Sequence, residues 1–295
     1  MLRRSLTRDI LRAAPAPTAA TALLVGDPVF DLSEQQQLGA VQKPAVPQQE
    51  VNVAPAALSA EVSHDLSRNE GNNATLPRLP GTGSEVKSIA KLMQEHGWKT
   101  SVFTGDLALK SVVEQASSPR VLHLATHGFF LPDQQVKNER GGQSNPSGLE
   151  DPMLRSGLYF AGANRTLAGK SSGHDPDNGV LTSMEVSNLN LRGTELVVLS
   201  ACDTGRGDIK NGEGVFGLRR ALQEAGAQKV LMSLWSVPDE ETLELMESFY
   251  GRWLSGIEAH DALKEAQLEM REKVKAKHDG KDLPFYWGAF VLAGR

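Results

Sequence analysis

The chain reads Glu195-Leu-Val-Val-Leu-Ser-Ala-Cys202 immediately before a polar, glycine-rich loop, and Cys202 is its only cysteine. A second apolar run, residues 121–126, is followed directly by His127 and Gly128. Short apolar runs bounded by turn residues are typical of strands buried in a parallel sheet. Because the carboxyl ends of parallel strands share one edge of the sheet, the two runs predict that a thiol and an imidazole meet there.

Elements of both kinds alternate along the rest of the chain. The pattern predicts further strands at residues 22–26, 99–103, 230–237 and 287–292, and helices that begin at Ser84, near Asp106, near Gly214, at Asp239 and at Glu258. Alternating strands and helices are typical of a mostly parallel sheet with helices on both faces. The expected fold class is therefore α/β.

Composition narrows the class further. The chain has 295 residues and a net charge of −5, with both signs interspersed. It has no basic stripe of the kind that would indicate nucleic-acid binding. A single cysteine rules out an internal disulfide framework and a cysteine-rich metal site, and a free thiol suits a reducing, cytoplasmic compartment. No apolar stretch has the roughly 20 residues that span a bilayer.

Domain boundaries follow from local composition. Residues 1–20 are arginine-rich and predict a tail or a short helix, whereas residues 21–295 predict one domain. Two polar stretches, at about 32–80 and 131–180, interrupt that domain and are expected to be insertions, the first of them largely without fixed structure.

The pairing of Cys202 with His127 predicts nucleophilic chemistry. A thiolate is the attacking form of cysteine, and a neighbouring imidazole is its usual activator. The backbone N–H groups of Gly128 and Cys202 are candidates to bind the oxyanion, because glycine allows a close approach of substrate to the backbone. The plain alternative is that Cys202 is a small buried apolar residue and His127 a structural one.

Other patterns have weaker functional interpretations. Residues 212–217 spell G-x-G-x-x-G, but about ten loop residues separate them from the preceding strand, which is unlike a dinucleotide site. Residues 163–171 lack the first glycine of a phosphate loop. His123 lies roughly 13 Å from His127 along a strand, so it is expected to be a core residue and not a metal ligand. Glu240 and Glu241 suit the first turn of a helix, whereas the role of Asp239 stays open.

Several segments, taken together and in order, resemble the CHAT-domain family of caspase-like cysteine peptidases. They are residues 24–28, 79–81, 123–128, 199–205, 212–214, 233–237 and 286–290. The resemblance implies a caspase–haemoglobinase-like three-layer sandwich with His127 and Cys202 as the catalytic dyad. It also implies that residues 233–237 pair with an extended substrate and that Trp235 faces it. Asp203 and Asp239 are then candidates for a first specificity pocket that prefers a basic residue.

The expected function is a cysteine endopeptidase that cleaves a protein substrate, needs no cofactor or metal, and is regulated in trans by a partner such as a repeat-containing sensor. Many members of the family follow helical repeats on the same chain, and here only about 20 residues precede the first expected strand. The alternatives are a caspase-like scaffold that acts by protein binding and, less favoured by the spacing of Gly212, a nucleotide-binding protein.

Overall fold

Two sheets organise the part of the chain that the computed structural model describes, which is residues 19–41, 75–130, 153–170, 177–200 and 213–294. The larger has the order β2-β1-β3-β7-β8-β9, with parallel neighbours except for the antiparallel pair β8–β9, and the smaller is antiparallel β4-β5-β6. Their strands are β1 Thr21–Pro28, β2 Lys99–Gly105, β3 Val121–Ala125, β4 Gly128–Phe130, β5 Ser156–Tyr159, β6 Val180–Thr182, β7 Leu196–Leu199, β8 Lys229–Ser233 and β9 Phe290–Gly294.

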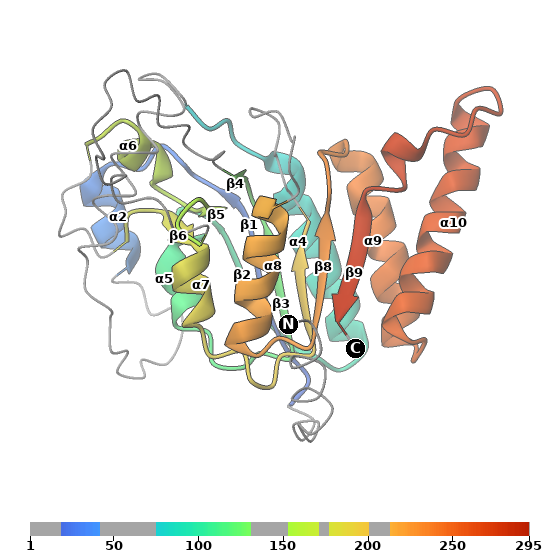
Figure 1. The fold of residues 1–295 in the computed structure, drawn as a ribbon, viewed down its shortest axis with the longest axis horizontal. Helices are drawn as coiled ribbons and strands as arrows, with labels where there is room; N and C mark the ends of the chain where they lie inside the picture. Colours follow the sequence, from blue (N-terminus) through green and yellow to red (C-terminus); the bar gives the residue numbers. More distant parts are fainter. Residues whose placement is uncertain (1–18, 42–74, 131–152, 171–176, 201–212, 295) are drawn as a thin grey trace, which may run out of the picture.

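Helices cover both faces of the larger sheet, as Figure 1 shows. Helices α5, α7 and α8 contribute to one core, α4 and α9 to the other, and α10 packs outside α9. The helices are α2 Glu34–Val41, α4 Pro80–Glu95, α5 Lys110–Glu114, α6 Ala163–Leu167, α7 Ser183–Ser187, α8 Glu213–Ala225, α9 Asp239–Leu254, α10 Ala259–Lys277 and the 3-10 turn η1 Pro284–Tyr286. This arrangement confirms the expected caspase-like α/β sandwich.

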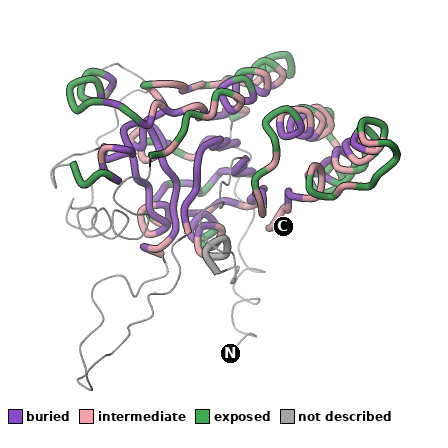
Figure 2. The backbone as a smooth tube through the Cα atoms, turned by 90° about the horizontal axis from the view of Figure 1, so that it is seen from above, coloured by how far each residue is buried: buried purple, intermediate pink, exposed green. Residues whose placement is uncertain are grey.

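The alternation of side chains in β3 explains why that strand lies at the centre. Leu122 and Leu124 enter the core under α5, α7 and α8, whereas Val121 and Ala125 enter the core under α4 and α9. Strands buried on both faces appear as continuous purple tube in Figure 2, in contrast to the exposed outer turns of the peripheral helices. Burying each large apolar side chain contributes about 1.5–3 kcal/mol, so β3 is fixed from both sides.

Two helices begin elsewhere than their expected caps. Helix α4 starts at Pro80, with Ser84 already inside it, because proline suits the first helical position, where no N–H is needed. Helix α5 starts at Lys110 and not near Asp106. Its first N–H groups, from Lys110 and Ser111, donate to the Asp177 carboxylate at 3.2 and 3.1 Å. The cap of α5 is thus supplied from a distant segment.

The last two strands also differ from expectation. Strand β8 ends at Ser233 and β9 begins at Phe290, because Ser233 lies opposite Phe290 in their antiparallel register. Residues 284–287 form η1 and its C-cap, so Trp287 is not part of a strand. Ordered elements also occur inside both polar stretches: α2 and residues 75–79 in the first, β5 and α6 in the second.

No helix in the described ranges is long and apolar enough to cross a bilayer.

A hydrogen-bonded network crosses the core under α4 and α9. His123 is fully buried, as expected of a core histidine, and its Nδ1 lies 3.0 Å from the Tyr250 hydroxyl. Its Nε2 lies 3.1 Å from Glu85 Oε1. One neutral tautomer satisfies all three groups, since Nε2 donates to the carboxylate and Nδ1 accepts from the phenol. The network joins β3 to α4 and α9 without an unpaired buried polar atom.

Replacing Tyr250 by Phe tests this network through pH. Burial, with the nearby Glu85 carboxylate adding to it, raises the pKa of Tyr250 well above its ordinary value of 10.0. Above about pH 10 the unfolded chain loses the phenolic proton, whereas the folded chain keeps it. The free energy of unfolding therefore falls as the pH rises. In Tyr250→Phe the free energy of unfolding should therefore fall less steeply above pH 10 than in wild type, by up to about 1.4 kcal/mol per pH unit, as measured by urea unfolding.

At neutral pH the same substitution should lower the free energy of unfolding by about 1–2 kcal/mol, because His123 loses a buried hydrogen-bond partner. Tyr286→Phe is the matched control, since the Tyr286 hydroxyl makes no hydrogen bond to a described residue and should cost less. Parallel stability curves for wild type and Tyr250→Phe between pH 9 and 11 would contradict the interpretation.

Candidate active site

His127 lies two residues beyond the end of β3, where the chain leaves the larger sheet and enters β4. The residue is 3% exposed, and its ring centroid lies 5.3 Å from that of Phe30. Its Nε2 lies 3.0 Å from the backbone carbonyl oxygen of Pro77. A carbonyl oxygen only accepts, so Nε2 carries a hydrogen and Nδ1 is the nitrogen able to take up a proton.

The strand that leads to Cys202 is the direct neighbour of the strand that leads to His127. Leu199 of β7 lies opposite Leu124 of β3, and the N–H of Ser200 donates to the Leu124 carbonyl at 3.2 Å. Cys202 itself and the adjacent Asp203 lie outside the described residues. What the structure brings together is therefore the imidazole of His127 and the strand end that precedes Cys202.

The smaller sheet fixes the direction of the Gly128 backbone. Gly128 faces Leu158 across β4 and β5, while the N–H of Tyr159 donates to the His127 carbonyl at 2.9 Å. That combination makes Gly128 and Leu158 a non-hydrogen-bonded pair of the antiparallel ladder, so the Gly128 N–H points away from β5. Among the described strands β4 lies at an edge of its sheet, so this N–H points to the side on which no described strand pairs.

A short segment without helix or strand, residues 75–79, precedes α4 and holds the imidazole. Asn164 of α6 anchors it, because the Asn164 side chain accepts from the Leu76 N–H at 2.8 Å and donates to the Leu76 carbonyl at 3.2 Å. Sequence reasoning placed this segment in an insertion and missed the contact of Pro77 with His127. Pro77 and Pro80 were the available signal, since the residue before a proline favours an extended backbone.

An ion pair ties the same segment to the end of β1. Arg78 donates from Nε and Nη2 to the two carboxylate oxygens of Asp27, at 2.8 and 2.6 Å. The Asp27 backbone, with φ of 47°, directs its own N–H to the Thr82 hydroxyl at 2.7 Å. The pairing stabilises the Pro77 carbonyl in its position, although the half-exposed Arg78 limits its contribution to about 1 kcal/mol.

The predicted substrate-binding residues have separate surroundings. Asp239 begins α9, and its carboxylate lies against Gly81 in the first turn of α4, a position favoured by the dipole of that helix. Trp235 follows β8 and donates its indole N–H to the Phe285 carbonyl at 2.9 Å, so it packs on η1.

The other sequence patterns do not form sites in the described residues. Residues 163–167 form α6, whose Asn164 holds residue 76, and the first glycine of the 212–217 pattern lies outside the described ranges. His123 and His127 have different partners, as described above. No group of three or more His, Cys, Asp or Glu residues in the described ranges could hold a metal ion.

The fold and the strand ends define a caspase-like α/β protein with a histidine at the carboxyl edge of its sheet. The family model of the CHAT domain matches residues 2–295, so the chain belongs to the CHAT-domain family.

Curated relatives match a smaller part of the chain. Over 115 residues it is 35% identical to Tetratricopeptide repeat protein 28 of Homo sapiens and 33% identical to the protein of the same name from Mus musculus. Each match covers 39% of this chain and 4% of the relative, so the chain spans only a small fraction of the length of these relatives.

Gly81 gives a direct test of how α4 and α9 fit together at this edge. A Cβ atom at position 81 would lie 2.1 Å from Asp239 Oδ2 and 2.5 Å from Asp239 Cβ, so the two helix starts would have to separate. Gly81→Ala should therefore cost about 1–3 kcal/mol in urea unfolding.

Gly39→Ala in α2 is the matched control, because nothing lies within 4 Å of a Cβ at that position. The control should be neutral or stabilise by up to about 1 kcal/mol, as alanine does in a helix. Equal stabilities of the two variants would show that α4 and α9 do not constrain each other at Asp239.

Proposed function

We propose that this chain is a cysteine endopeptidase in which Cys202 is the nucleophile and His127 the base. The observation that carries the proposal is the register of β3 and β7. His127 and Cys202 each follow the opposed pair Leu124–Leu199 by three residues. Two peptide units join Cys202 to Ser200, so their Cα atoms are at most about 7 Å apart. This short connection supports a thiol near the edge at which His127 lies.

The proposed mechanism uses the two nitrogens of His127 in different roles. Nδ1 takes the proton from the Cys202 thiol, and the thiolate attacks the substrate carbonyl carbon. The imidazolium then donates that proton to the leaving amine, which breaks the peptide bond and leaves a thioester. Water, deprotonated by the same nitrogen, hydrolyses the thioester. Throughout, the Pro77 carbonyl accepts from Nε2–H, which orients the ring and stabilises its positive charge.

The oxyanion of the tetrahedral intermediate needs a donor beside the base. The Gly128 N–H supports this role because it points away from β5, and the N–H of Cys202 is the second proposed donor. A Cβ at position 128 would make only ordinary contacts of 3.5 and 3.7 Å within the described structure. Internal packing thus gives no reason for glycine there, whereas the approach of a substrate does.

Substrate selection is proposed to involve Asp203, Trp235 and Asp239. Carboxylates beside the scissile bond would favour a basic residue in the substrate, since a partly buried carboxylate prefers a cationic partner. For regulation we propose a repeat-containing protein that acts in trans, supported by the name of the two curated relatives.

Cleavage assays test the dyad. Cys202→Ala and His127→Ala should each lower the cleavage rate of a partner protein by at least about a thousandfold, and Gly128→Ala by about ten- to a hundredfold, because its Cβ enters the space of the substrate. New termini are mapped by mass spectrometry against wild type. His260→Ala is the matched control and should cleave normally, because the His260 side chain is exposed at the start of α10. Equal cleavage by Cys202→Ala would refute the proposal.

The alkylation rate of the sole cysteine separates a peptidase from a binding scaffold. Iodoacetamide should modify Cys202 at pH 7 faster than it modifies a model thiol, by about tenfold or more, because a neighbouring imidazolium favours the thiolate. His127→Ala should remove this advantage. One added carbamidomethyl group per chain reports Cys202 alone. A wild-type rate no faster than the model thiol would favour a scaffold that acts by binding.

A further inference from the structure

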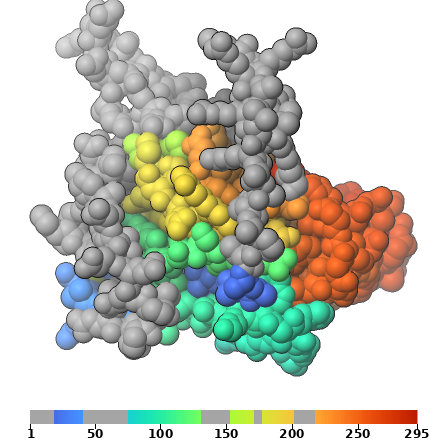
Figure 3. Space-filling view, turned by 90° about the horizontal axis from the view of Figure 1, so that it is seen from below, coloured from blue at the N-terminus to red at the C-terminus, as the bar shows by residue number. Residues whose placement is uncertain are grey.

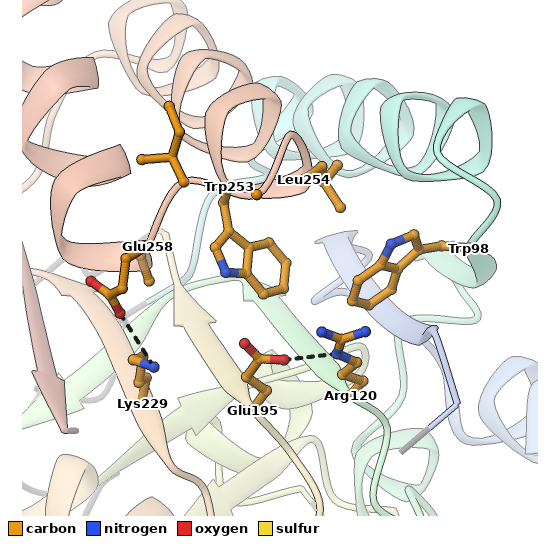
Figure 4. Close-up of a pocket in the computed structure, with 10 residues that line it drawn as sticks. Trp98, Arg120, Glu195, Lys229, Trp253, Leu254 and Glu258 are labelled. Atoms are coloured by element: carbon orange, nitrogen blue, oxygen red, sulfur yellow. Dashed lines mark hydrogen bonds and ion pairs between the residues drawn. The ribbon is translucent and has the colours of Figure 1, made fainter. Parts of the chain in front are cut away.

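A pocket of about 420 Å³ lies at the end of the sheet opposite to His127. The loops that precede β2, β3 and β7, the first residue of β8, and the turn between α9 and α10 line it (Figure 4). The side chains that matter are Trp98, Arg120, Glu195, Lys229, Trp253 and Glu258. Figure 3 views the molecule from this end, with the start of β1 in blue near α4 in teal and the α9–α10 pair in orange and red.

Two tryptophans form the apolar part of this pocket. The ring centroids of Trp98 and Trp253 are 5.6 Å apart, and the rings are tilted by 54°. The guanidinium carbon of Arg120 lies 4.9 Å from the centroid of the Trp98 ring. A flat apolar group that enters the pocket can therefore contact an indole face and a cation at the same time.

The hydrogen-bonding capacity that remains in the pocket is mostly that of donors. Arg120 uses Nε for Glu195 Oε2, at 2.7 Å, and Figure 4 shows its two terminal nitrogens turned toward the space between the tryptophans. These nitrogens and the Trp253 indole N–H make no hydrogen bond to a residue in the described part of the chain. The fork of a guanidinium matches the two oxygens of a carboxylate.

The charges around the pocket select the charge of the ligand. Arg120 pairs with Glu195, and Lys229 lies 3.4 Å from Glu258, so two cations face two carboxylates. Glu258 also accepts from the backbone N–H of His260 at 2.7 Å, so part of its acceptor capacity is already used. A dianion would be repelled by the two acids more strongly than a monoanion.

We propose that this pocket binds a monocarboxylate carried on a flat apolar group. The carboxylate accepts hydrogen bonds from the terminal nitrogens of Arg120, with the Trp253 N–H as a further donor, and the apolar group packs on the indole of Trp253. His127 follows Arg120 by seven positions, across the five residues of β3, or roughly 23 Å at about 3.3 Å per residue, so the two sites are distinct. The inference is independent of the proposed peptidase activity.

Indole NMR of the intact chain tests the proposal with phenylacetate as the probe. The four tryptophans give an internal control, because Trp98 and Trp253 line the pocket whereas Trp235 and Trp287 contact η1 and the residues beside it. Phenylacetate should shift only the first two indole signals, saturably, with half-saturation near about 1 mM. Phenylacetamide and inorganic phosphate should bind at least about tenfold more weakly.

Arg120→Gln should weaken phenylacetate binding by about tenfold or more, since the paired donors are lost. Arg271→Gln is the matched control, because Arg271 also lies over a tryptophan, Trp287, and pairs with an acid, Asp282, but at another site. Trp253→Phe is a second variant that keeps a ring and removes the N–H, should Arg120→Gln unfold.

Four results would overturn the proposal. They are shifts of all four indoles alike, equal binding of phenylacetamide, tighter binding of phosphate or of phenethylammonium, and unchanged binding by both pocket variants.

Discussion

The parallel pairing of β3 with β7 is the constraint on which the candidate site depends. Backbone hydrogen bonds fix the register at Leu124 opposite Leu199, and a shift by one residue would turn every side chain of β7 to the wrong face. Val197 and Leu199 enter one core and Leu196 and Val198 the other, so such a shift would be resisted by both. The register is therefore set by burial, and it fixes how the carboxyl ends of the two strands lie relative to each other.

Helix α4 supplies the second requirement, because it fixes the segment that holds the imidazole. Its buried face, which includes Val86, Ile89 and Met93, packs under β1 and β3, and Glu85 bonds to His123 within that core. Pro77 lies only three residues before the helix start. The Arg78–Asp27 pair and the Asn164 contacts hold the intervening backbone from two other elements. The orientation of the His127 ring therefore depends on how residues 75–80 are packed, and not on His127 alone.

Sequence patterns predicted the elements that depend on local periodicity. Helix α9 begins at Asp239, as predicted, and the strands β1, β2 and β3 lie within a few residues of their predicted positions. The errors occur where distant residues decide. Asp177 caps α5 across 66 residues, and the pairing of β8 with β9 sets where each strand ends. The contact between Pro77 and His127 joins positions 50 residues apart, and no local pattern encodes such a contact.

The pocket beside Arg120 and the site beside His127 lie at opposite ends of the sheet, and β3 runs between them. Strand β3 runs from the residue after Arg120 almost to His127, but it is paired along both edges and buried on both faces, so it cannot slide without breaking two ladders. Helix α9 also runs between the two ends, packed on α4 and α10. Its last turn carries Trp253 of the pocket, and its first residue, Asp239, touches the start of α4 beside the segment that holds His127. A 16-residue helix spans about 24 Å, so α9 reaches from the pocket to the start of α4. Helix α4 spans the same distance, because it begins three residues after Pro77 and ends three residues before Trp98, so two packed helices and the central strand all run between the two ends.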